Sequence, residues 1–298
     1  MCARFFNLAP ALAGKSGSMA VFALFSRSQK PARSMQLAMD CLGKGTVRVA
    51  ELPSANVPAL EVDNELDQPV LFLVGDLVKG GRQDRVVSAS VVVPAKSRSS
   101  ISVRCVEPRR WHTFEDDNTF RASETCCPSS VRSVLHTAAG DTRHADQHTV
   151  WSRVSNTLAD FDVTHAEGSV TAVHDAKRDD VNRILSSFEV MGDPVGIAIA
   201  IGDKVVAVDV FATPTLCSAA WRRLARAYAL DSLKSAATEC SVSRADVRTV
   251  LELAANAQWT SNASSGEQCS TSMFGDWKAS TLTAGPDDLI HASVVRIH

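Results

Sequence analysis

The sequence lacks several features that would assign it at once to a functional class. Its 31 basic and 33 acidic residues give a formal net charge of -2, without the basic excess of a dedicated nucleic-acid binder. No apolar run approaches the roughly 20 residues that a membrane-spanning helix needs. The eight cysteines form no CxxC pair, and the adjacent Cys126 and Cys127 suit neither a zinc knuckle nor an ordinary disulfide. We therefore expect reduced thiols, a cytoplasmic protein, and neither nucleic acid nor membrane as a partner.

The composition is that of a globular protein, with 45% hydrophobic and 21% charged residues in a chain of 298. This length can bury a substantial core. Residues 1–17 read as a disordered leader, because Asn7 and Pro10 interrupt the apolar start before it reaches the length of a signal peptide. We expect residues 18–298 to form a single α+β domain.

The first part of this domain, residues 18–111, is expected to be β-rich, because glycines and prolines separate short apolar runs in the manner of antiparallel hairpins. The second part, residues 112–176, holds six of the eight histidines. It has few long apolar runs, which predicts irregular structure with one helix around 141–154.

The third part, residues 177–298, is expected to be α/β. A helix is predicted over 179–191, followed by two strands joined at Gly202-Asp203, a strong signal for a two-residue hairpin. A second helix should begin at Thr213 or Pro214. The fold prediction is therefore a β-rich N-terminal portion packed with a C-terminal helix–hairpin–helix portion, and the role of the 238–298 tail stays open.

Two polar runs, Gly75 to Arg85 and Cys105 to Trp111, carry the candidate site. Strand alternation places Gln83 and Arg85 on the apolar face, with Arg82 and Asp84 on the other. Pairing the strands about a turn at 96–98 brings Glu107 opposite Val87 and diagonal to Arg85, at about 7–8 Å. We therefore expect Gln83, Arg85 and Glu107 to point inward at one mouth of the β-structure, beside Trp111.

Two interpretations of this inward cluster are open. Buried charges must be paired, because an unpaired one costs several kcal/mol. An ion pair between Arg85 and Glu107 would then be a structural lock. Alternatively, the cluster lines a pocket in which arginines hold an anionic group while Glu107, Asp76 or Asp84 orients a hydroxyl or a water.

Two further patterns are weaker. Gly80-Gly81 could bring backbone amides close to a phosphate, but the run lacks the glycine spacing and following helix of a Walker or Rossmann loop. His144 and His148 are four residues apart, a spacing that suits a metal on a helix, yet no zincin-type Glu lies between them. We predict neither a metal nor a cofactor.

The order of several short motifs resembles a known family, the ARG and Rhodanese-Phosphatase-superfamily-Associated Protein domain. The resemblance covers roughly residues 18–237. It rests on Gly45-Thr46-Val47, Glu51, Asn64, Gly75-Asp76, Gly80 to Arg85, Val93-Pro94-Ala95, Cys105-Val106-Glu107 and Arg110-Trp111, and later on Val150-Trp151, Val195 to Ala198, Val208 to Phe211, and Trp221 to Tyr228.

The resemblance implies a link by association to ADP-ribosylglycohydrolase-type proteins, and so to ADP-ribose or NAD metabolism, without implying a catalytic activity. Our leading hypothesis is a protein that binds or processes a phosphorylated nucleotide-sugar ligand. Its expected residues comprise anion contacts (Arg82, Arg85, Arg110), a polar orienter (Gln83), a stacking wall (Trp111), a phosphate loop (Gly80, Gly81) and acid/base candidates (Glu107, Asp76). The alternative is a non-enzymatic interaction or scaffold module with the cluster as a lock; either is compatible with a homo-oligomer.

Overall fold

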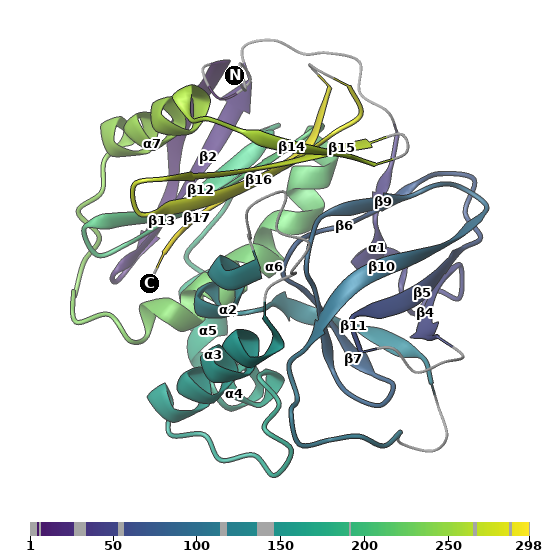
Figure 1. The fold of residues 1–298 in the computed structure, drawn as a ribbon. Coiled ribbons are helices and arrows are strands. Elements are labelled where there is room, and N and C mark those ends of the chain that lie inside the picture. Colours follow the sequence, from purple (N-terminus) through teal and green to yellow (C-terminus); the bar gives the residue numbers. More distant parts are fainter. Residues whose placement is uncertain are drawn as a thin grey trace. The chain divides into compact units, whose positions relative to one another are not determined.

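The computed structural model describes residues 5, 7–26, 34–52, 57–113, 118–135, 146–190, 192–264, 267–285 and 288–297. These residues group into two compact units (Figure 1). Unit 1 comprises the described residues within 5–26 and 179–297, and unit 2 those within 34–135 and 146–178. Each unit thus draws on segments far apart in the chain, where we had expected one domain over 18–298. Both combine antiparallel sheets with helices, so the predicted α+β class is confirmed.

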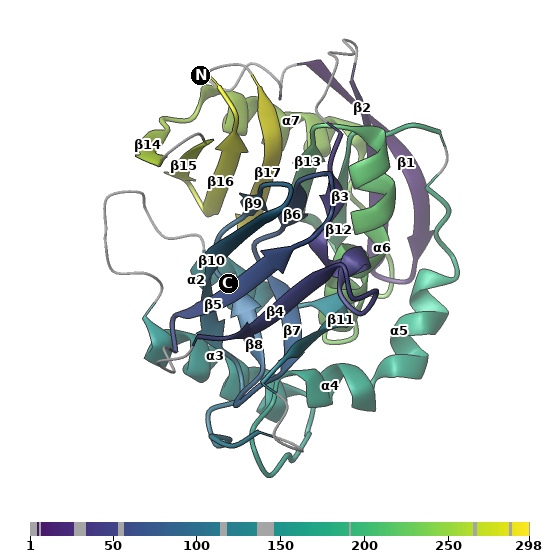
Figure 2. The ribbon, with the colours of Figure 1, turned by 90° about the vertical axis from the view of Figure 1, so that its right-hand side faces the viewer.

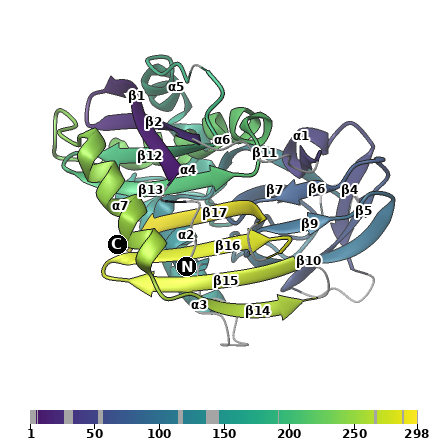
Figure 3. The same cartoon turned by 90° about the horizontal axis from the view of Figure 1, so that it is seen from above.

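Unit 1 contains an eight-stranded antiparallel sheet in the order β1-β2-β12-β13-β17-β16-β15-β14 (Figure 3). Its strands are β1 (Leu8–Ser16), β2 (Met19–Ser26), β12 (Gly196–Ile201), β13 (Lys204–Phe211), β14 (Thr260–Ser264), β15 (Glu267–Phe274), β16 (Trp277–Thr283) and β17 (Leu289–Arg296). Its helices are α5 (Arg178–Leu185, whose first residue belongs to unit 2), α6 (Pro214–Ser232) and α7 (Arg244–Asn256).

The leader prediction is wrong from Leu8 onward. Residues Leu8 to Ser16 pair with β2 along its whole length, from Leu8 opposite Ser26 to Ser16 opposite Met19. Pro10 is tolerated because β1 is an edge strand, where a proline removes no hydrogen bond that a second neighbour needs.

The predicted helix–hairpin–helix order of unit 1 is confirmed in α5, the β12–β13 hairpin and α6. Gly202 forms the hairpin turn with a φ of 62°. Thr213 caps α6 by accepting a hydrogen bond from the Leu216 amide, and Pro214 occupies the first turn. The 238–298 tail, whose role the sequence had left open, contributes α7 and strands β14 to β17.

Unit 2 contains a six-stranded antiparallel sheet in the order β11-β7-β8-β10-β5-β4 (Figure 2). Its strands are β4 (Val47–Glu51), β5 (Ala59–Asn64), β7 (Asp76–Gly80), β8 (Arg85–Val87), β10 (Ser97–Cys105) and β11 (Phe120–Cys126). The two edge strands meet, because Ala50 bridges to Thr119 and the Glu51 amide donates to the Asn118 carbonyl at 3.2 Å. The sheet therefore closes into a small barrel. A core of valines, Leu60, Phe72, Ile101 and Phe120 fills it.

A second sheet in unit 2 joins β3 (Gln36–Leu37), β6 (Val70–Phe72) and β9 (Val91–Val93). The run from Arg85 to Val93 therefore forms two strands, β8 and β9, that lie in different sheets. Val87 pairs with Val103, where we had expected Glu107, and Arg85 pairs with Cys105. This shift is an even number of residues, so it preserves the predicted faces while moving Glu107 beyond the end of β10.

The prediction of mostly irregular structure for 112–176 is wrong among the described residues of that range, although the helix predicted around 141–154 overlaps α3. They form β11, α2 (Ser129–Leu135), α3 (Gln147–Asp160) and α4 (Thr171–Ala176); the remaining helix of unit 2 is α1 (Ala38–Cys41). The α3 helix buries Val150, Val154 and Leu158, a four-residue spacing within an otherwise polar sequence. Among the described residues, we find no helix that combines the length and apolar character needed to cross a membrane.

Candidate functional site

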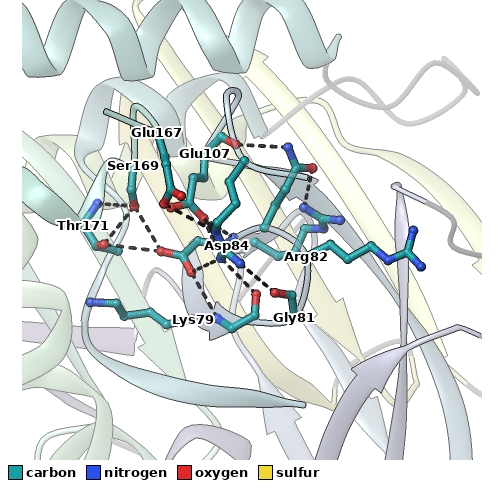
Figure 4. A network of polar contacts seen from close by, with 12 residues as sticks. Lys79, Gly81, Arg82, Asp84, Glu107, Glu167, Ser169 and Thr171 are labelled. Atoms are coloured by element: carbon teal, nitrogen blue, oxygen red, sulfur yellow. Dashed lines mark hydrogen bonds and ion pairs between the residues drawn. The ribbon is translucent and has the colours of Figure 1, made fainter. Parts of the chain in front are cut away.

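The predicted polar residues gather at one end of the unit 2 barrel, which we call the mouth. Here β4 ends at Glu51, β7 ends at Gly80, β10 ends at Cys105, and β8 begins at Arg85. The connection from Gly81 to Asp84 and the segment from Val106 to His112 extend beyond these strand ends. Figure 4 shows the resulting network of polar contacts.

Gly80 and Gly81 are required at the mouth because neighbouring groups leave no room for a side chain. Their φ values are 132° and 49°. A Cβ atom on Gly80 would lie 2.4 Å from the Thr119 carbonyl oxygen, and one on Gly81 would lie 2.4 Å from the Phe120 ring. Their amides donate to the Asp84 carboxylate and to the Thr119 carbonyl. Both amides that we had expected to approach a phosphate are thus used within the protein.

Arg110 is the centre of the network and is 1% exposed. Its Nε donates to Glu107 Oε2 at 2.7 Å, and its Nη1 donates to the carbonyls of Gly81 and His112 at 2.7 and 3.0 Å. Its Nη2 donates to the Gly80 carbonyl at 3.2 Å and to Asp84 Oδ1 at 3.3 Å. Arg110 therefore joins the Gly80–Asp84 connection to the Glu107–His112 segment.

Arg85 is fully buried and points into the barrel as predicted, but its partners are not those expected. Its Nη1 donates to Gln83 Oε1 at 2.9 Å, and its Nη2 lies 3.4 Å from Glu51 Oε1. Gln83 in turn donates to the Glu107 carbonyl at 3.0 Å. Glu107 pairs with Arg110, so the expected Arg85–Glu107 ion pair is replaced by two separate pairs. Burial lowers the pKa of Arg85.

Asp84 is buried at the mouth, although alternation had placed it on the outward face. The carboxylate accepts hydrogen bonds from Ser169 Oγ at 3.0 Å and Thr171 Oγ1 at 3.4 Å. The segment from Glu167 to Thr171 therefore covers it. Burial raises the pKa of Asp84, and the neighbouring Glu107 carboxylate raises it further.

Asp76 does not join this cluster. It begins β7, whereas Gly80 ends the same strand, about 13 Å away at the usual rise per residue. Its Oδ2 accepts the Leu73 amide at 2.8 Å, and its Oδ1 accepts the Cys126 thiol at 3.7 Å. The structure thus separates the two residues that we had considered together as acid/base candidates, Asp76 and Glu107.

The outer edge of the mouth, which we call the rim, consists of Arg82, Trp111, His112 and Glu167. The Arg82 guanidinium lies 5.6 Å from the centre of the Trp111 ring, and Trp111 is 49% exposed. The Arg82 side chain extends away from the buried network (Figure 4). His112 Nε2 lies 3.6 Å from Glu167 Oε1.

Glu51, Glu167, Ser169 and Thr171 were missed as site residues. Glu51 Oε1 accepts a hydrogen bond from the Arg82 backbone amide at 3.2 Å, so it fixes the backbone of this rim residue. Glu51 is one of the residues that carry the family resemblance, but no local pattern marked it as a site residue. The 167–171 segment lies more than eighty positions from Asp84, as the separation of 85 between Ser169 and Asp84 shows. No local pattern marks such a contact.

Of the two histidines with metal-binding spacing, His144 lies outside the described residues. His148 packs edge-on against Trp151, with ring centres 5.6 Å apart. In the described part of the chain, no group of three or more His, Cys, Asp or Glu side chains is arranged to hold a metal ion.

The family model of the ARG and Rhodanese-Phosphatase-superfamily-associated Protein domain, ARPP-1, matches residues 12–295. The chain belongs to the ARPP-1 family. The match extends the resemblance seen in the sequence through the tail, so the ARPP-1 domain includes residues of both units. No curated protein and no solved structure matches this ARPP-1 chain.

Proposed function

We propose that this ARPP-1 domain binds a small phosphorylated nucleotide-sugar ligand, such as ADP-ribose or an NAD derivative, at the Arg82–Trp111 rim. The observation that carries the proposal is the half-exposed Trp111 ring beside the Arg82 guanidinium. An exposed aromatic face can stack a nucleobase, which is worth about 1–3 kcal/mol. The guanidinium can hold a phosphate through paired hydrogen bonds.

The buried network supports this rim in our proposal, and it does so without touching the ligand. Arg110 holds the carbonyls of Gly81 and His112, which precede Arg82 and follow Trp111 in the chain. The buried Arg110 side chain therefore fixes the backbone next to both Arg82 and Trp111. Such support is what a binding site needs, because ordering the site in advance lowers the entropic cost of binding.

The family context is consistent with this ligand class, because the family description associates the domain with ARG proteins. This association is contextual. The proposed roles of Arg82 and Trp111 rest on their chemistry and exposure, and we assign no catalytic role to Glu107 or Asp76.

Isothermal titration of the full chain with ADP-ribose, NAD and inorganic phosphate tests the proposal. We expect saturable ADP-ribose binding that weakens about tenfold or more in Trp111→Ala, since tenfold corresponds to about 1.4 kcal/mol. Arg82→Ala should weaken the binding of both ADP-ribose and phosphate. Arg98→Ala is the matched control, because Arg98 is an exposed arginine of unit 2 paired with Asp63 and Glu61. No binding by any of the three compounds would reject the proposal.

The alternative function is a non-enzymatic interaction module. It is favoured by the way Arg110 directs its hydrogen bonds into the protein, as a structural lock does. Exposed tryptophan and arginine are also frequent at the centres of protein interfaces. If the chain self-associates in light-scattering measurements, and Trp111→Ala abolishes the association while ADP-ribose has no effect, the interaction module is the better description.

A further inference from the structure

Three carboxylates surround the single guanidinium of Arg110. Asp84 and Glu107 lie 3.3 and 2.6 Å from its Nη2, and Glu167 lies 3.7 Å from its Nε. The Asp84 and Glu107 side chains are 7% and 4% exposed, whereas Glu167 is 25% exposed. Arg110 can balance one of these negative charges, so a second buried carboxylate is costly while it remains ionised.

Asp84 has the hydrogen-bonding environment to hold a proton. Its Oδ1 accepts from the Gly80 amide and from Arg110, which can only donate. Its Oδ2 faces two hydroxyls, Ser169 Oγ and Thr171 Oγ1, which lie 2.9 Å from each other. A hydroxyl can either donate or accept. If Oδ2 carries a proton, it can donate to Ser169 Oγ while that hydroxyl turns to donate to Thr171, and no hydrogen bond is lost.

The other charged groups around Asp84 do not remove its preference for the protonated form. The segment after β10 contributes Glu107 and Arg110, and β8 contributes Arg85, which is itself paired with Glu51 of β4. The covering segment contributes Glu167, and His165 Nδ1 accepts the Ser169 amide at 3.3 Å. Two further charged residues of the described chain in this region are His112, paired with Glu167, and Lys79 of β7, paired with Asp175.

We propose that Asp84, together with Ser169 and Thr171, forms a proton-binding site inside unit 2, so that the folded protein binds a proton that the unfolded chain releases. The raised pKa of Asp84 agrees in direction. A carboxyl whose folded pKa exceeds its unfolded value of about 3.9 stabilises the fold fully below that unfolded value. This contribution is lost as the pH rises through the folded pKa.

The site also has a structural consequence for the rim. Asp84 shares Arg110 with the carbonyls of Gly81 and His112. Loss of the proton therefore changes the charge beside the side chain that fixes Arg82 and Trp111. The proposal does not require a ligand at the rim, and it survives if ADP-ribose fails to bind.

Asp84→Asn in the full chain tests the site, because asparagine resembles the protonated acid. Its amide oxygen can accept from Gly80 and Arg110, and its amide nitrogen can donate to Ser169. We expect Asp84→Asn to melt at or above the wild-type temperature at about pH 8, and to lose this advantage as the pH falls toward the unfolded aspartate pKa of about 3.9. Asp175→Asn, which removes an exposed carboxylate, controls for a general charge effect.

A variant that is less stable than wild type, by a margin that grows with pH, would show that Asp84 is an ordinary ionised partner of Arg110 and would overturn the proposal. Carboxyl carbon NMR of wild-type protein labelled at aspartate provides a test that needs no Asp84 variant. We expect one aspartate carboxyl to titrate at a higher pH than the usual aspartate range, and its resonance to shift in Ser169→Ala. If no aspartate titrates above that range, the site does not exist.

Discussion

Glu107 and Arg110 form an ion pair inside unit 2, with 2.6 Å between Glu107 Oε2 and Arg110 Nη2. The Arg110 amide also donates to the Glu107 carbonyl at 3.4 Å, so the chain turns tightly between them. The planar guanidinium can then reach Gly80, Gly81 and His112 at once. One side chain thereby closes the mouth of the barrel, which gives the pair a structural role whatever the rim binds.

Arg110→Lys should destabilise the protein strongly. Lysine retains the charge but lacks the planar fork that serves several acceptors. Each buried carbonyl or carboxylate that loses its hydrogen bond from Arg110 without replacement costs about 1–3 kcal/mol. Urea unfolding followed by circular dichroism should show a much lower midpoint. Arg98→Lys is the matched control, and its midpoint should not change. Equal midpoints for the two variants would show that the network contributes little.

Gly80→Ala should be far more damaging than Gly45→Ala. Both glycines have positive φ, 132° and 79°, so alanine is strained at either position. A Cβ on Gly45 has no neighbour within 4 Å among the described residues, whereas on Gly80 it meets the Thr119 carbonyl at 2.4 Å. We expect a cost of about 1–2 kcal/mol for Gly45→Ala from strain, and about 1–3 kcal/mol more for Gly80→Ala from overpacking. Comparable thermal midpoints for the two variants would contradict the close approach of the Thr119 carbonyl, just before the start of β11, to Gly80.

Strand alternation predicted the inward side of Gln83 and Arg85, but it predicted neither the burial of Asp84 nor the partners of these residues. Alternation placed Gln83 and Arg85 inward, and the true register keeps those faces because it differs from the expected one by an even number of residues. The break between β8 and β9 is not visible in a run of valines and serines. Asp84 is buried by Ser169 and Thr171, and contacts across such a separation have no local signature. Ser243 and Asp246, by contrast, form a readable helix start that we missed.

Ser243→Ala should lower the free energy of unfolding by about 1 kcal/mol, the usual cost of losing an N-cap. Ser243 and Asp246 form a capping box at the start of α7, in which the Asp246 amide donates to Ser243 Oγ and the Ser243 amide donates to Asp246 Oδ2. Hydrogen bonds from Ser243 lower the pKa of Asp246. The stabilisation from Asp246 is therefore present above its unfolded pKa and is lost as the pH falls through the folded value.

Melting curves of wild type and Ser243→Ala across the acid range test this linkage. The difference in melting temperature between the two should narrow on acidification, because the variant has already lost the hydrogen bond from Ser243 Oγ, which is the largest cause of the lowered pKa of Asp246. Thr249→Ala is a control on the same helix, since the Thr249 hydroxyl donates to the Ala245 carbonyl and not to the Asp246 carboxylate. A constant difference in melting temperature between wild type and Ser243→Ala at every pH would show that the stabilisation from the cap does not depend on the ionisation of Asp246.

Cys217 should resist alkylation until the protein unfolds. It lies fully buried on α6, and burial, with a smaller effect from Asp209, raises its pKa to about 12. Because the thiolate is the nucleophile, only about one molecule in ten thousand would be reactive at about pH 8. Cys269 is more exposed, and burial and Glu267 also raise its pKa. Mass spectrometry after iodoacetamide treatment should therefore find Cys269 modified before Cys217, and both modified in denaturant. Rapid native labelling of Cys217 would mean that α6 opens readily from the sheet.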